Sequence, residues 1–216
     1  MLTQIILMRH AETSLPSVFH GYESDVDLGP RGLRQAELIA PVVAAYQPNG
    51  LVSSGMLRAR QTAEAIARVT GLPIRIEKDL HERKVGKMQG TPVCGEFGVW
   101  PETLKRWVDG ETNYTPEGME SFDDIQRRIM PVWERITHDF QGKSAVVVAH
   151  GIVCRVLLLS ILEGYNVADW ARLGRITNVS ISEVIGDGKK WVAERIGYVP
   201  EEVQKLNETE EMPTRR

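Results

Sequence analysis

The eight residues SAVVVAHG, at positions 144–151, are a near-continuous apolar run that ends at a histidine and a glycine. A run of this kind is typical of a strand buried on both faces, as at the centre of a parallel sheet. The apolar stretch at 152–162 predicts a helix directly after the strand. A strand that leads at once into a helix favours an α/β fold, with His150 at the junction.

The start of the chain repeats this arrangement. Residues 4–8, QIILM, predict a short buried strand that ends at Arg9 and His10. In open α/β sheets, ligands bind in the crevice at the carboxyl ends of the strands. A single histidine at a strand end is more often structural than functional. Two of them, each after a buried strand, favour a shared site made by His10 and His150.

The rest of the chain continues the alternation of strands and helices. Ser121 and Asp124 predict a capping box at the start of the clearest helix. Leu33 is expected on the apolar face of the helix that begins at Pro30, and Pro41 is expected to kink that helix. Further elements are expected as strands at 50–53 and 74–76, helices at 56–69 and near 102–108, and a closing hairpin at 179–185 and 191–196.

This order of elements predicts the fold class. We expect a three-layer α/β/α sandwich with a mostly parallel sheet, an antiparallel edge strand and a lid-like insertion at about 83–120. One domain is expected over residues 1–200, because the length suits a single core. The polar residues 201–216 are expected to form a frayed C-terminal tail.

The composition is that of an ordinary globular protein, with 216 residues, 42% hydrophobic, 25% charged and a formal net charge of −3. No global positive field attracts nucleic acid or an anionic membrane, so an anion site must be local. No apolar run reaches the about 20 residues that span a bilayer, and no secretory signal is expected. Cys94 and Cys154 match no metal or redox spacing, and Cys154 is expected to be a small core residue. We therefore expect a cytoplasmic protein.

Arg58 lies in an unusual place for a cation. It falls in the first turn of the helix expected at 56–69, where the helix dipole favours negative charge. A surface arginine that is slightly destabilising would explain it. An anion held between the helix N-terminus and the guanidinium would instead make both favourable. Arg60 and Arg68, on the same helix, are expected to be solvated.

Four stretches of the chain resemble, in order, the motifs of the histidine phosphatase superfamily, also called the phosphoglycerate mutase-like family. They are LMRHAET at 7–13, SSGMLRARQTA at 53–63, LHER at 80–83 with Gly86 and Gly90, and VVVAHG at 146–151. Weaker matches lie at 32–36, at 116–121 and at Asn178. The resemblance runs from about residue 4 to residue 196, and the strand and helix contexts of the motifs are intact.

The resemblance implies an enzyme that hydrolyses a small-molecule phosphate monoester through a phosphohistidine intermediate. His10 is implied as the nucleophile and Glu82 as the general acid and base. The groups implied to hold the phosphoryl oxygens are Arg9, Arg58, a protonated His150 and the amide of Gly151. This scheme needs no metal and no cofactor, and the five histidines show no ligand clustering.

Three positions depart from the family pattern. Ala11 stands where the family usually has glycine, which a backbone φ below zero permits. Leu15 and Pro16 replace a Trp-Asn pair, which removes one phosphate contact. Val85 replaces the tyrosine that mutases carry three residues beyond the acid/base glutamate, which weakens the mutase interpretation.

Three alternative functions stay open at this point. A cofactor-dependent phosphoglycerate mutase would use the same pocket, although Val85 and the short insertion favour hydrolysis. A phosphohistidine protein phosphatase would be expected to lack the insertion. A non-catalytic phosphate-binding module would not need the complete set of site residues.

The expected partner is a small phosphorylated metabolite, rather than nucleic acid or a membrane, and a homodimer stays open. The shared pocket does not identify the ester, so we expect specificity to come from the insertion. The cationic candidates there, each more often solvated than substrate-binding, are Arg83, Lys87, Lys105 and Arg106.

Overall fold

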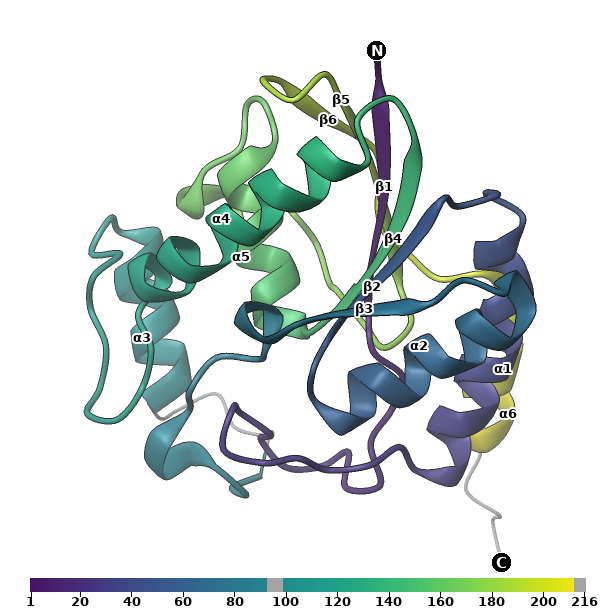
Figure 1. Cartoon of the computed structure of the whole chain (residues 1–216). Coiled ribbons are helices and arrows are strands. Elements are labelled where there is room, and N and C mark those ends of the chain that lie inside the picture. The colour runs from purple at the N-terminus through teal and green to yellow at the C-terminus, as the bar shows by residue number, and fades with distance from the viewer. Residues whose placement is uncertain (93–98, 212–216) are drawn as a thin grey trace, which may run out of the picture.

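The computed structural model describes residues 1–92 and 99–211. Within these residues, six strands form a single sheet in the order β3-β2-β4-β1-β5-β6 (Figure 1). The strands are β1 (Thr3–Arg9), β2 (Gly50–Ser54), β3 (Ile74–Glu77), β4 (Ser144–Ala149), β5 (Ile181–Gly186) and β6 (Trp191–Tyr198). The first four strands are parallel, and β5 and β6 add the expected antiparallel hairpin beside β1. The run at 144–149 therefore forms a central strand, as predicted.

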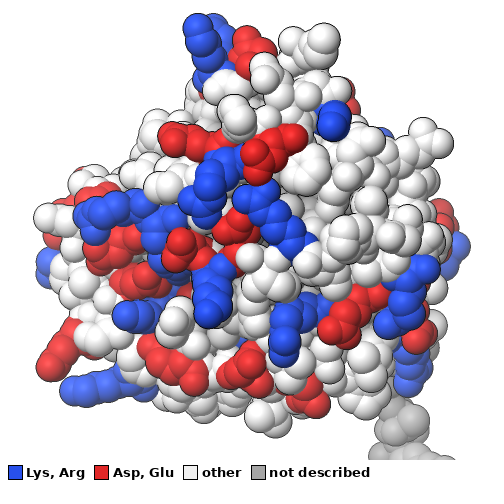
Figure 2. Space-filling model, in the orientation of Figure 1, with Lys and Arg blue, Asp and Glu red and all other residues white. Residues whose placement is uncertain are grey.

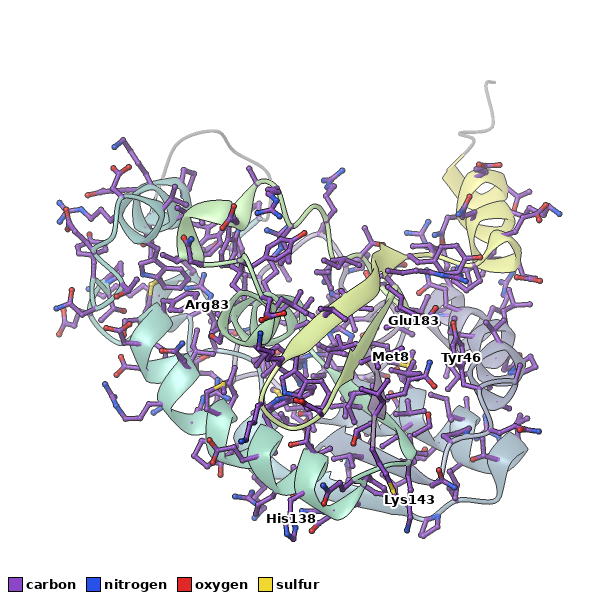
Figure 3. The ribbon with its side chains drawn as sticks, turned by 90° about the horizontal axis from the view of Figure 1, so that it is seen from above. Met8, Tyr46, Arg83, His138, Lys143 and Glu183 are labelled. Atoms are coloured by element: carbon purple, nitrogen blue, oxygen red, sulfur yellow. The ribbon has the colours of Figure 1, made fainter. Side chains whose placement is uncertain are left out.

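Helices cover both faces of the sheet (Figure 1). The helices are α1 (Pro30–Ala44), α2 (Leu57–Thr70), α3 (Val99–Val108), α4 (Phe122–Asp139), α5 (Gly151–Ile161) and α6 (Glu201–Glu211), with 3-10 turns η1 (Lys78–Leu80), η2 (Gly86–Met88) and η3 (Val167–Trp170). Helices α3, α4 and α5 lie on one face, and α1, α2 and α6 lie on the other. Figure 3 shows these layers from above, with Arg83 on the α5 side and Tyr46 on the α1 side. The three-layer α/β/α prediction is confirmed.

Alternation along β1 explains the two cores. Ile5 and Leu7 pack with α4 and α5, whereas Ile6 and Met8 pack with α1 and α2. Successive side chains of a strand point to opposite faces, so a strand covered on both sides must be apolar throughout. The unbroken apolar runs of β1 and β4 therefore follow from their central position.

Helix α1 corrects one detail of the sequence-based expectation. Leu33 is 48% exposed rather than buried. The preceding residue, Gly32, instead packs against the segment that follows β1. A Cβ at Gly32 would lie 1.9 Å from the carbonyl oxygen of Glu12. The other expected members of the apolar face, Ala36, Ala40 and Val43, are buried as predicted. The helix also continues through Pro41 to Ala44, and Pro41 lies on its exposed side.

The expected lid-like insertion at 83–120 contributes to the core. Its helix α3 carries Trp107, which is fully buried against Trp100, Phe122 and Trp170. The predicted capping box is also present, because Ser121 and Asp124 exchange backbone and side-chain hydrogen bonds. Helix α4 therefore begins where the sequence predicted. Cys94 lies outside the described residues.

The C-terminal segment corrects the sequence-based expectation of a frayed tail. Glu201–Glu211 forms α6, and Val203 is fully buried in the core beneath α1. Gln35 of α1 also donates from Nε2 to Oδ1 of Asn207 at 2.9 Å. The sequence did not reveal this packing, because the segment is mostly polar. Its described contacts with α1 include the buried side chain of Val203 and the hydrogen bond to Asn207.

We expect Val203→Ala to lower the free energy of unfolding by about 2 kcal/mol, because it removes two buried methyl groups and leaves a small cavity. Glu202→Ala, at an exposed neighbouring position, is the control and should change this free energy by less than about 0.5 kcal/mol. Urea denaturation measures both. Equal effects of the two substitutions would show that α6 is not packed on α1 in solution.

Charge is mixed on the surface. Figure 2 shows Lys and Arg interspersed with Asp and Glu on the face in view, as expected for a chain with a net charge of −3. No helix in the described part of the chain is both long and apolar enough to cross a membrane.

Candidate active site

The pairing of β1 with β4 brings His10 and His150 together. Arg9 is in register with Ala149, so the two histidines follow the last paired residues of adjacent parallel strands. The backbone N–H of His10 donates to the carbonyl of Ala149 at 3.0 Å. The two imidazole rings lie with their centroids 5.1 Å apart. The structure thus places the two predicted histidines side by side at this edge of the sheet.

A cavity of about 330 Å³ lies at this edge. Arg9, His10, Arg58, Glu82 and Gly151 all line it. His150 is fully buried and lies beneath the lining, next to His10. The predicted residues, which come from four separate motifs, thus surround one cavity. The other lining residues are Glu12, Thr13, Pro16, Val18, Phe19, His20, Ile152, Arg155, Arg175, Ile176, Thr177 and Asn178.

His10 is held with one ring nitrogen toward the protein. Its Nδ1 lies 2.6 Å from the carbonyl oxygen of Ala11. Because a carbonyl oxygen only accepts, Nδ1 carries the proton of the neutral ring, and Nε2 keeps a lone pair. Nδ2 of Asn178 donates to the carbonyl of His10 at 2.9 Å and so fixes its backbone. This arrangement leaves Nε2 unprotonated, as a nucleophilic nitrogen must be.

The electrostatic environment favours the neutral form of His10. Burial, followed by the positive charges of Arg58 and Arg9, holds the pKa of His10 well below its ordinary value. Each of these factors penalises the imidazolium ion. The neutral ring, with its lone pair available, is therefore favoured over the imidazolium ion.

We expect Arg58→Met to raise the pKa of His10, because it removes the cation that opposes protonation most strongly. The acid limb of a pH–activity profile should then move to higher pH, since more His10 is protonated at any given pH. An NMR titration of the imidazole protons measures the pKa directly. Arg60→Met, at an exposed position on the same helix, is the control. An unchanged pKa in Arg58→Met, or an equal rise in both variants, would contradict this assignment.

Arg9 is half-buried and Arg58 is buried, and neutral groups anchor both guanidinium groups. Arg9 Nη1 donates to the carbonyl of Ile176 at 3.0 Å, and Arg58 Nη1 donates to the carbonyl of Ser24 at 2.8 Å. Arg58 is only 1% exposed, and burial lowers its pKa to about 10 although Glu82 opposes the shift. The Nε atoms of both arginines are buried without a hydrogen-bond partner among the described residues. Unpaired buried donors of this kind are costly unless a ligand satisfies them.

His150 has a buried ring nitrogen without a hydrogen-bond partner among the described residues. Its Nε2 lies 2.7 Å from Oγ of Ser54, which also accepts from the amide of Met56 at 3.3 Å. If the Ser54 hydroxyl donates to Nε2, the ring proton sits on Nδ1, which is buried and has no partner in the described chain. Burial, then Arg58 and then His10 hold the pKa of His150 well below its ordinary value. A phosphoryl dianion would raise that pKa again, so the protonated form expected from the sequence belongs to the complex.

Glu82 is held in place by the backbone. Its Oε1 accepts from the amide of Arg83 at 2.9 Å, and its Oε2 accepts from the amide of Ile152, near the start of α5, at 3.3 Å. The side chain is 8% exposed and lines the cavity. A carboxyl group in this position can exchange a proton with a group bound above His10.

Val179, beside the site, has an unusual backbone conformation. Its φ is +50°, which a β-branched residue rarely adopts. Its N–H donates to the carbonyl of Arg9 at 3.1 Å. The preceding residue, Asn178, donates from its side chain to the carbonyl of His10. Residues held in this way cluster at functional sites. The loop before β5 thus positions the end of β1.

The cationic candidates of the insertion lie away from the cavity. The guanidinium of Arg83 is 2% exposed and stacks 4.2 Å from the ring centroid of Trp100. Lys105 pairs with Asp109, and Arg106 pairs with Glu102 and Glu111. Lys87 is exposed. None of the four belongs to the lining.

Arg155 and Arg175 line the cavity instead, and the sequence analysis missed both. A signal for Arg155 was present, because it follows Gly151 by four residues and so lies on the same face of the helix. Arg175 gave no comparable signal, because the path of its loop depends on tertiary packing. Within the described residues, no cluster of histidine, cysteine or acidic side chains could hold a metal ion. Cys154 is buried as predicted, and burial raises the pKa of its thiol.

Comparison with known proteins agrees with these observations. The model of the histidine phosphatase superfamily (branch 1) matches residues 5–198. The chain belongs to this family. It is 32% identical over 196 residues to a metal-independent phosphoserine phosphatase of Arabidopsis thaliana, covering 88% of this chain and 79% of that protein.

Other members of the histidine phosphatase superfamily show the same likeness. A glucosyl-3-phosphoglycerate phosphatase of Mycolicibacterium vanbaalenii is 32% identical over 192 residues, 85% of this chain and 84% of that protein. The solved structure of a mycobacterial glucosyl-3-phosphoglycerate phosphatase superposes with a TM-score of 0.80 at 26% identity, covering 92% of this chain and all of that one. Three mycobacterial relatives that are 30% identical are longer, and the chain spans 55% of their length.

Proposed function

We propose that this histidine phosphatase hydrolyses a small-molecule phosphate monoester through a phosphohistidine intermediate on His10. The observation that carries the proposal is the set of buried nitrogen atoms around His10 that have no hydrogen-bond partner among the described residues. Unpartnered nitrogens of Arg9, Arg58 and His150 belong to residues grouped around a neutral imidazole, in a cavity open to small molecules. Named phosphatases among the relatives support the same class of reaction.

In the first half of the proposed reaction, Nε2 of His10 attacks phosphorus. A P–N bond forms as the P–O bond to the alcohol breaks, and the Glu82 carboxyl group gives its proton to the leaving oxygen. Arg9, Arg58 and His150 stabilise the charge on the three equatorial oxygens. The alcohol then leaves, and His10 carries the phosphoryl group.

In the second half, water attacks the phosphorus of the phosphohistidine. The Glu82 carboxylate takes a proton from the water, and the P–N bond breaks. Phosphate leaves, while His10 returns to its neutral form and Glu82 to its acid form. Both halves use the same carboxyl group in opposite directions, which suits a residue fixed by two backbone amides.

The mutase alternative differs in the fate of the phosphoryl group. A relative named phosphoglycerate mutase-like protein 4, from Arabidopsis thaliana, is 31% identical to this chain. Val85, where mutases carry tyrosine, is 3% exposed and bridges to Met119, so no hydroxyl is supplied from this position. Hydrolysis is therefore the function that the site supports better.

Incubation with a panel of phosphate monoesters tests the proposal. We expect inorganic phosphate to be released from at least one ester, with one alcohol formed for each phosphate. An isomeric phosphate ester that accumulates without free phosphate would show a mutase. No turnover of any ester, with an intact fold shown by circular dichroism, would contradict the proposed function.

A further inference from the structure

Two arginines line the cavity without a role in the proposed reaction. Arg155 lies on α5, four residues after Gly151, and its backbone is therefore about 6 Å farther along the same face of the helix. Arg175 lies in the loop between η3 and β5. The next residue, Ile176, accepts the hydrogen bond from Arg9. Both arginines are thus neighbours of the groups around His10.

Arg155 is held rigidly by neutral groups. Its Nη1 donates to the carbonyl of Trp170 at 3.2 Å, and its Nη2 donates to the carbonyl of Gly174. The guanidinium also lies over the ring of Trp170, 4.9 Å from its centroid. These contacts fix the plane of the guanidinium but bring no negative charge. Burial, then Arg175 and then Arg9 lower its pKa.

Arg175 adds a second uncompensated charge. Its side chain is exposed, and no ion pair joins it to another residue in the described part of the chain. Arg172, three residues earlier in the same loop, instead pairs with Asp169 at 3.1 Å. Two like charges beside Arg9 repel one another unless an anion lies between them.

The acidic residues of the lining do not supply that anion. Glu12 forms a bidentate pair with Arg31. Glu82 is held by the amides of Arg83 and Ile152, on the side toward α5. Positive charge therefore exceeds negative charge in the cavity, although the whole chain has a net charge of −3.

We propose that Arg155 and Arg175 bind a second anionic group of the substrate. The preferred ester then carries a carboxylate or a second phosphate close to the phosphoryl group that is transferred. Both arginines line the same cavity of about 330 Å³ as His10, so the second anionic group belongs to a small ester. This inference rests on the proposed function, because it assigns the transferred phosphoryl group to Arg9, Arg58 and His10.

Four esters separate the two kinds of second anion. 3-Phosphoglycerate carries a carboxylate, and propane-1,3-diol bisphosphate carries a second phosphate. Glycerol 3-phosphate and p-nitrophenyl phosphate carry neither. We expect kcat/KM for the first or the second ester to exceed that for glycerol 3-phosphate by about 10- to 100-fold, because each charge-assisted contact to a guanidinium is strong. The ester that is preferred identifies the second anion.

Substitution then tests the two arginines. Arg175→Ala and Arg155→Gln should each reduce this preference ratio by about tenfold. Arg172→Ala is the matched control, because it removes a cation from the same loop outside the cavity, and it should keep both the ratio and the activity. Arg175 is exposed, so its variant keeps the test valid if Arg155→Gln does not fold.

Calorimetry on His10→Ala separates this inference from the proposed function. Tighter binding of the second-anion ester than of glycerol 3-phosphate, lost with Arg175→Ala, would support the subsite even if no ester is hydrolysed. Hydrolysis with no preference, or a preference that survives both arginine substitutions, would overturn the subsite and leave the proposed function standing. Neither hydrolysis nor preferential binding would overturn both.

Discussion

Replacing His10 with alanine should reduce kcat by roughly 10⁶-fold, as removal of a covalent nucleophile does in other enzymes. The physical reason is that Nε2 of His10 is the atom proposed to form the bond to phosphorus. Burial and two arginines favour the neutral form of the imidazole. The substitution removes both the lone pair that attacks phosphorus and the nitrogen that later leaves it. Phosphate release from the preferred ester measures the loss, and circular dichroism checks the fold.

His138→Ala is the matched control for this substitution. His138 is exposed near the end of α4 and borders a shallow cavity with Thr3, at the opposite edge of the sheet from His10. Figure 3 shows it at the end of that helix. Its loss should leave kcat within about twofold. A large effect of His138→Ala, or residual activity in His10→Ala near the wild-type level, would place the nucleophile elsewhere.

Replacing Glu82 with glutamine should lower kcat by about 10²- to 10⁴-fold for an ester with an alcohol leaving group. Glutamine keeps the shape and the acceptor oxygen that bonds the amide of Arg83, but it cannot transfer the proton. The loss should shrink sharply for p-nitrophenyl phosphate, provided that phosphorylation limits the rate. The phenolate of that ester leaves with little need for a proton.

Arg58→Ala distinguishes proton transfer to the leaving group from binding of the phosphoryl oxygens. Arg58 is proposed to contact the phosphoryl oxygens, whatever the leaving group, so its loss should be similar for both esters. An equal loss for both esters in Glu82→Gln would mean that another group is the acid, or that attack by water limits turnover. A burst of the released phenolate would distinguish those two outcomes.

Much of the fold could be predicted because few arrangements suit a strand such as 144–149. A strand apolar on both faces must be covered on both sides, and this requirement determines the layers. The nearness of His10 and His150 followed from the same reasoning, since each ends such a strand and β1 pairs with β4. Glu82, by contrast, was named only through the resemblance to the histidine phosphatase superfamily. The capping box at Ser121 and Asp124 was predictable because it is local.

The remaining features depend on contacts between distant segments. Leu33 is exposed because Gly32 approaches the backbone of Glu12, which no pattern within the helix reveals. Helix α6 forms because Val203 fits a core made by other elements. Arg175 reaches the cavity because its loop passes beside Arg9. Each of these features is set by tertiary packing, which overrides local propensity.

Trapping the intermediate tests the central claim most directly. The protein is mixed with an ester labelled on phosphorus, quenched within milliseconds, and examined for covalent label. The account predicts a phosphoenzyme that is labile in acid and stable in base, with the label on His10 and absent from His10→Ala. Label on a serine, or label that persists in His10→Ala, would contradict the account.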